Sequence, residues 1–115
     1  AVNLHETTDP LRSFMAGLAQ SGEKTAQCLY GSKGWVAHGF TDAWLGTRPL
    51  GDTAWSMCVV CGAWAALHLW DMFRYSHDLA LLREDVLPVL GGAVEFFLSH
   101  LMAHGPGGCL VSGPS

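Results

Sequence analysis

The stretch TAWSMCVVCGAWAALHLW, residues 53–70, contains no Asp, Glu, Lys or Arg over eighteen positions. A helix that is apolar on every side has to be surrounded by other elements, either in a protein core or in a membrane. Eighteen such residues also meet the rough length of a membrane span. We favour the core, because Ser56, His68 and two cysteines dilute the hydropathy and no basic cluster flanks the stretch.

The remaining segments predict an all-α chain. Pro10 directly after Thr8 and Asp9 is typical of a helix start, and Gly22 is expected to end that first helix. Pro88 and the pair Gly91-Gly92 should weaken the last helix, which is amphipathic. The expected helices cover residues 8–22, 23–30, 53–75 and 78–101, with a loop at 31–52 and a turn with a short extended piece at 105–115.

The chain is short for so apolar a helix. Its 115 residues are half apolar and 14% charged, which excludes a disordered tail, and the net charge of −4 provides no basic patch for nucleic acid. A helix over 53–75 would be roughly 35 Å long at 1.5 Å per residue, and three neighbours, two of them short, could not cover it. We therefore expect residues 1–115 to be an internal portion of one larger helical domain, without an internal domain boundary.

The cysteines stand at positions 28, 58, 61 and 109. A chain this rich in aliphatic residues does not need disulfides, so free thiols are expected. The spacing Cys58-x-x-Cys61 is compatible with redox chemistry or zinc, but a second pair or a suitably spaced His is missing. We favour packing in the core for this pair, and the sequence implies neither a metal nor a cofactor.

The loop KGWVAHGFTDAWLG, residues 33–46, combines two Trp, one His, one Phe and one Asp with three Gly. Together with NLHE (3–6), CGAWAALHLW (61–70) and LPVLGGAVEFFLSHL (87–101), it resembles consecutive pieces of the family 95 glycoside hydrolases. These are the inverting α-L-fucosidases, which have an (α/α)6 barrel. The resemblance spans most of the chain, although the family commonly carries a His-Asn pair where Gly39 and Phe40 stand here.

The resemblance implies that the aromatic loop lines a sugar pocket at the barrel mouth. A Trp face would stack on the deoxy sugar, while His and Asp would bind its hydroxyl groups. The alternatives are that the two Trp cap the core and that the His satisfies a backbone carbonyl. His68 is expected in the core. The implied substrate-binding residues are Trp35, His38, Thr41, Asp42 and Trp44.

Catalytic residues are not expected within this chain. The resemblance places the general acid, a Glu, just after Ser115, an Asn-rich water-activating motif just before Ala1, and the activating Asp far downstream. The acidic residues that are present look like helix caps or charges on a solvated face, so the 115-residue piece alone is expected to be inactive. This interpretation covers Glu6, Asp9, Asp52, Asp71, Asp78 and the run Arg83-Glu84-Asp85.

The expected function is therefore that of a fragment of an exo-acting α-L-fucosidase, which hydrolyses terminal α-L-fucosyl linkages with inversion. Its partner would be a fucosylated oligosaccharide or polysaccharide, with no nucleic acid and no membrane. The alternatives are a related α-L-galactosidase, since one extra hydroxyl is easily accommodated, and a non-catalytic carbohydrate-binding or structural segment. Glycan processing favours secretion or a vesicle, and the compartment otherwise stays open.

Overall fold

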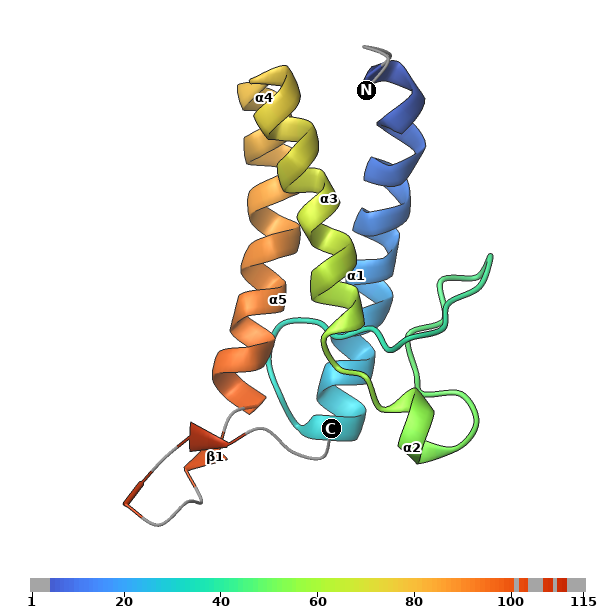
Figure 1. The fold of residues 1–115 in the computed structure, drawn as a ribbon, viewed down its shortest axis with the longest axis vertical. Coiled ribbons are helices and arrows are strands. Elements are labelled where there is room, and N and C mark those ends of the chain that lie inside the picture. The colour runs from blue at the N-terminus through green and yellow to red at the C-terminus, as the bar shows by residue number, and fades with distance from the viewer. Residues whose placement is uncertain (1–4, 101, 104–106, 109, 112–115) are drawn as a thin grey trace.

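The computed structural model describes residues 5–100, 102–103, 107–108 and 110–111. Three long helices lie side by side in it, α1 (Asp9–Tyr30), α3 (Cys61–Ser76) and α5 (Leu87–His100) (Figure 1). The all-α prediction is confirmed. The shorter elements are the 3-10 helix η1 (His5–Thr8), α2 (Thr53–Ser56), α4 (Leu79–Leu81), the π-helical turn η2 (Leu82–Val86), and the antiparallel strands β1 (Met102–Ala103) and β2 (Leu110–Val111).

Helix α1 is one continuous helix, so the predicted break at Gly22 is wrong. Gly22 is inside the helix because its missing side chain makes room for the loop: a Cβ there would lie 2.7 Å from the Val36 carbonyl oxygen. The helix ends instead at Gly31, which has a φ of 61° and donates its N–H to the Gln27 carbonyl at 3.1 Å. A glycine in the left-handed conformation at this position is a common helix ending.

The predicted helix over 53–75 is real but interrupted. Helix α2 stops at Ser56, residues 57–60 are not helical, and α3 begins at Cys61. At the start of α3 the backbone N–H of Gly62 donates to the carbonyl of Ala37 at 3.0 Å, which joins the helix to the loop between α1 and α2. The hydrogen bond from Gly62 to the loop therefore lies next to the break at residues 57–60. Apolar periodicity alone did not indicate this break.

The last predicted helix consists of three successive parts. Asp78 caps α4 by accepting the N–H groups of Ala80 at 2.8 Å and Leu81 at 3.3 Å. The chain then widens into η2, where the Leu87 N–H bonds the carbonyl of Leu82 five residues back. Pro88 explains the wide turn, since it offers no N–H to the preceding turn. Helix α5 then continues through the glycine pair and ends at His100.

The core lies between the three long helices and η2. It contains Met15 and Leu18 of α1, Leu69 of α3 and Val86 of η2, all fully or almost fully buried. An ion pair ties α1 to η2 at the edge of this core: Arg12 donates to Oδ2 of Asp85 from Nε at 2.8 Å and from Nη2 at 2.6 Å. Asp85 also holds the pKa of Arg12 above its usual value, chiefly through the hydrogen bond.

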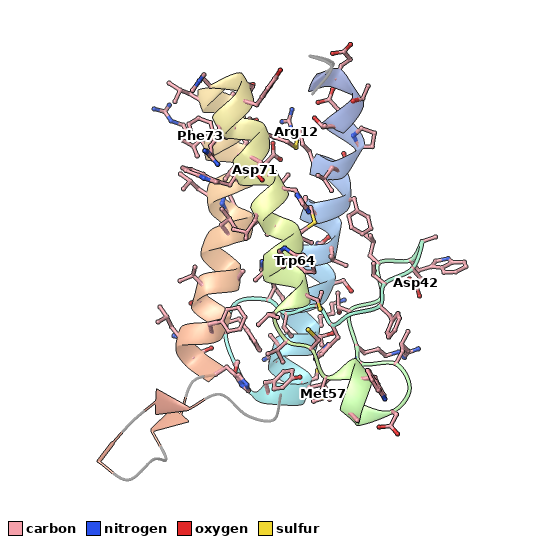
Figure 2. All side chains as sticks on the ribbon, in the orientation of Figure 1. Arg12, Asp42, Met57, Trp64, Asp71 and Phe73 are labelled. Atoms are coloured by element: carbon pink, nitrogen blue, oxygen red, sulfur yellow. The ribbon has the colours of Figure 1, made fainter. Side chains whose placement is uncertain are left out.

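Helix α3 is covered on one face only. Ala66 and Leu69 are buried, whereas Trp64 on the opposite face of α3 is 70% exposed (Figure 2 labels its position). His68 is also exposed, so its predicted core position is wrong within the described chain. By length and composition the stretch Ala54–Ser76 could cross a membrane, with a mean hydropathy of 1.3. One such stretch is weak support for a membrane span, because core helices pass the same test.

The end of the chain is described only in part. Strands β1 and β2 pair with Met102 opposite Val111, and Gly107 and Gly108 between them have positive φ values, as a turn requires. The predicted turn and short extended piece are therefore found at residues 107–108 and 110–111. The remaining residues of that prediction, including Cys109 and 112–115, lie outside the described residues, as does the NLHE motif except for His5 and Glu6.

Candidate functional site

The predicted sugar-binding residues lie on the long connection between α1 and α3. This connection leaves α1 at its C-terminal end and enters α3 at its N-terminal end, and α5 ends at the same end of the bundle (Figure 1). The connection has two parts. We call residues 34–38 the central segment and residues 39–46, which project sideways from the bundle, the arm.

The central segment is threaded between all three long helices. Trp35 donates its backbone N–H to the Gly92 carbonyl of α5 at 3.3 Å, and Val36 donates to the Gly22 carbonyl of α1 at 3.3 Å. The Ala37 carbonyl accepts from α3, as described above. Three consecutive residues, 35–37, thus form one backbone hydrogen bond each, and each bond goes to a different long helix. These bonds fix the start of the arm.

Trp35 is a core residue. Its side chain is only 3% exposed, and its indole Nε1 donates to the Val89 carbonyl at 2.7 Å. Glycines from three helices make room for the ring: a Cβ on Gly62 or Gly92 would come within 2.7 Å of the indole, and one on Gly22 within 3.0 Å. The burial of the ring favours the alternative that Trp35 packs in the core over the expected sugar contact.

His38 is buried as well, with 4% of its surface exposed. Its Nδ1 lies 2.7 Å from the Thr47 carbonyl oxygen, and its Nε2 lies 2.6 Å from the Tyr30 hydroxyl. Because a carbonyl can only accept, Nδ1 carries a proton, and in the neutral imidazole Nε2 then accepts from Tyr30. Both nitrogens are therefore occupied within the chain, and the alternative that His38 satisfies a backbone carbonyl describes this structure.

Tyr30 and Thr47 are residues that the sequence analysis missed. The Tyr30 hydroxyl can donate to His38, and burial raises the pKa of this phenol above its ordinary value. Thr47 closes the arm: its carbonyl also accepts the backbone N–H of His38 at 3.2 Å, and its hydroxyl lies 2.6 Å from that of Thr25 on α1. Neither residue has a sequence signal of its own, since both roles depend on the position of His38.

The arm is shaped by Asp42. Its Oδ1 accepts the backbone N–H groups of Trp44 at 2.9 Å and Gly46 at 3.0 Å, a local pattern by which Asp stabilises turns. Asp42 itself lies well outside the three-helix bundle (Figure 2). Trp44 is 87% exposed, and Thr41 and Phe40 are exposed too. The structure thus separates the five predicted residues into two buried at the start of the arm and three exposed on it.

Four of the described acidic residues make structural contacts. Asp52 and Asp78 cap helices, Asp71 lies 3.4 Å from Arg74 on the surface, and Asp85 pairs with Arg12. These contacts agree with the predicted structural roles of Asp52, Asp71, Asp78 and Asp85. Among the residues that the structure describes, no group of three or more His, Cys, Asp and Glu could hold a metal ion.

Comparison with known proteins identifies the family. The model of the "Glycosyl hydrolase family 95 catalytic domain" matches residues 1–115. The chain belongs to this family. Glycoside hydrolase family 95 domains are (α/α)6 barrels, and the helical structure is consistent with a fragment of one.

Two relatives of this chain carry fucosidase names. The chain is 39% identical over 114 residues to "Alpha-L-fucosidase 2" of Arabidopsis thaliana, a match covering 98% of this chain and 13% of that protein. It is 40% identical over 101 residues to "Probable alpha-fucosidase A" of Aspergillus niger, covering 86% of this chain and 13% of that protein. The chain thus spans about an eighth of the length of these relatives.

Proposed function

We propose that the whole natural protein carrying residues 1–115 is an exo-acting α-L-fucosidase that removes terminal fucose from glycans with inversion. Residues 1–115 would then form one wall of its single catalytic domain. The family match and the names of two relatives support a glycoside hydrolase that acts on fucosides. A fucosylated oligosaccharide or polysaccharide is the proposed substrate.

The observation that carries this proposal is the exposed aromatic arm. Within residues 1–115, Trp44 is almost completely exposed on a turn that Asp42 holds in shape, and the start of the arm is bonded to three helices. A solvent-exposed indole on a well-fixed loop suits stacking against the apolar face of a deoxy sugar. We assign direct sugar contact to Thr41, Asp42 and Trp44.

Trp35 and His38 have a different role in this proposal. Both are buried with their polar atoms satisfied, so they position the arm and do not touch the sugar. Loss of either would displace the contact residues indirectly. This division explains why the same loop contains both core-type and surface-type aromatic residues.

The reacting groups are proposed to come from outside residues 1–115. Inversion needs a protonated carboxylic acid on the leaving oxygen and a second group that activates water, about 6.5 to 9.5 Å away on the other side of the sugar. The described acidic side chains that cap helices or form ion pairs are unsuited to either role. We propose that a Glu following residue 115 is the general acid.

The test uses the whole natural protein with an aryl α-L-fucoside and follows the released anomer by NMR. Release of the β-anomer supports inversion. We expect Trp44→Ala to lower kcat/KM about tenfold, the loss that corresponds to roughly 1.4 kcal/mol of stacking, and Trp44→Phe to retain most of the activity.

Each other outcome has a distinct meaning. Full activity of a folded Trp44→Ala variant would show that Trp44 does not contribute to sugar binding, and would contradict the proposed role of the arm. Faster hydrolysis of the matching α-L-galactoside would favour the related galactosidase, and no hydrolysis of either sugar by the folded protein would favour a binding or structural role.

A further inference from the structure

The paired cysteines at the start of α3 have no role in the proposed sugar site. The thiol of Cys61, the first residue of α3, donates a hydrogen bond to the sulfur of Cys58, and the two Sγ atoms lie 2.8 Å apart. Both side chains are half-buried, whereas Cys28 on α1 is exposed. All three are free thiols in this structure, as the sequence predicted. The expectation of core packing describes Cys58 and Cys61 only in part.

We infer that Cys58 and Cys61 form an intramolecular disulfide in an oxidising environment and thereby fasten the start of α3 beneath the arm. A disulfide requires two sulfurs about 2.05 Å apart, and this pair is already close to that separation. The backbone between them is a turn, in which the Cys61 N–H faces the Cys58 carbonyl at 3.4 Å. Closing the bond therefore requires little change in the chain.

The position of the pair gives the bond a structural consequence. Gly62, next to Cys61, donates to the Ala37 carbonyl of the central segment, and a Cβ on Gly39 would lie 3.8 Å from the Cys61 sulfur. The thiols thus lie at the junction of α3 with the start of the arm. The bond would close residues 58–61, which include most of the non-helical break between α2 and α3, into a small covalent ring.

The chemistry is exchange with a low-molecular-weight disulfide such as glutathione disulfide. The Cys58 thiolate attacks one glutathione sulfur, which forms a mixed disulfide and releases one glutathione thiolate. The Cys61 thiolate then attacks the Cys58 sulfur and releases the second glutathione. Two cysteine thiols are oxidised, one glutathione disulfide is reduced to two glutathione thiols, and the two protons pass from the cysteines to glutathione.

The environment of Cys61 favours a bond that is slow to reopen. Burial, with the hydrogen bond to Cys58, raises the pKa of the Cys61 thiol to about 11. A thiol of high pKa is a poor leaving group, so a reductant attacking Cys58 would displace Cys61 slowly. The raised pKa of Cys61 therefore suits a slowly exchanging disulfide better than a rapidly cycling redox catalyst.

The sequence offers a simple assay. Trypsin cuts after Lys24, Lys33 and Arg74 but not between Arg48 and Pro49, so Cys58 and Cys61 fall together in peptide 34–74 and Cys28 falls in peptide 25–33. The whole natural protein is equilibrated, folded, in glutathione buffers of increasing oxidation, then treated with iodoacetamide and digested without reduction. Mass spectrometry reads both peptides.

As the buffer becomes oxidising, we expect peptide 34–74 to carry no alkyl groups. Its mass should then be two hydrogen atoms below that of the reduced, unalkylated peptide. Peptide 25–33 has a single cysteine and is the matched control, which carries an alkyl group or a glutathione throughout. The melting temperature of the unmodified protein should rise on oxidation by about 2 to 5 °C, an increase that Cys58→Ser abolishes and Cys28→Ser preserves.

Several results would overturn the inference. Two alkyl groups on peptide 34–74 of the folded protein at every buffer composition would show that the pair does not close. So would glutathione adducts on this peptide without loss of the two hydrogens, a linkage of either cysteine to another peptide, or closure only after unfolding in urea. Each readout is independent of fucosidase activity.

Discussion

Replacing Trp35 with Ala should destabilise the helical bundle strongly. Truncating a buried Trp costs about 3 to 5 kcal/mol, because the lost contacts leave a cavity. The Val89 carbonyl would also lose its indole donor, and an unsatisfied buried acceptor costs about 1 to 3 kcal/mol. The glycines around the ring cannot fill the space, since they have no side chains. We therefore expect a loss of at least about 4 kcal/mol in the free energy of unfolding.

The measurement combines urea denaturation of the whole natural protein with hydrogen exchange of its backbone amides. Exchange is the sharper readout, because it reports locally on the Trp35 and Val36 amides, whose acceptors lie on α5 and α1. Both amides should exchange much faster in Trp35→Ala. Trp35→Phe keeps a ring but removes the donor, so it should fall between the variant and the natural protein.

Trp44→Ala is the matched control, since it removes the same side chain from an exposed position in the same loop. It should leave the denaturation midpoint and the exchange of the central segment unchanged. An unchanged midpoint and unchanged exchange in Trp35→Ala would refute the core assignment. Equal destabilisation by the two substitutions would refute the separation of a buried central segment from an exposed arm.

Three further perturbations test other parts of the fold by thermal unfolding of the whole protein. Asp85→Asn should destabilise by about 1 kcal/mol, because it breaks the pair that joins α1 to η2, whereas Asp71→Asn in an exposed pair should have almost no effect. Gly62→Ala should cost about 1 to 3 kcal/mol through overpacking, while Gly91→Ala, whose Cβ meets nothing within 4 Å, should be neutral or stabilising; equal effects would contradict the packing. Burial raises the Tyr30 pKa above its ordinary value of 10.0, so the stability that the protonated phenol contributes is present below pH 10.0 and is lost as the pH rises through the folded-state pKa. Tyr30→Phe should lack this loss of stability at alkaline pH. The same pH dependence of stability in Tyr30→Phe and in the natural protein would contradict this prediction.

The helices could be predicted from the sequence, but their interruptions could not. Apolar periodicity and the Pro and Gly signals indicated helices over most of the described residues. Gly22 was read as a helix end because glycine is a poor helix former, yet it is retained inside α1 because the loop backbone packs on it. The break before Cys61 coincides with a hydrogen bond to the loop. Both errors concern contacts between residues far apart in sequence, which local patterns do not contain.

The site shows the same limit at the level of single residues. The composition of residues 33–46 correctly indicated a specialised loop, and the resemblance indicated the family. Trp35 and Trp44, however, are nine residues apart with similar neighbours, and only the surrounding glycines on three helices distinguish the buried one from the exposed one. His38 is likewise a residue type that often binds sugar hydroxyl groups, but Tyr30 and Thr47 already occupy its two ring nitrogens.

The arm and the bundle depend on each other through the central segment. Three helices hold residues 35–37 by one backbone bond each, and Trp35 in return fills the space that the glycines of those helices leave. A substitution at Trp35 or at the glycines around it should therefore both reduce stability and displace the arm, whereas a substitution at Trp44 should affect sugar binding alone. The ratio of lost activity to lost stability at the two tryptophans thus tests directly whether the buried half of the loop exists to fix its exposed half.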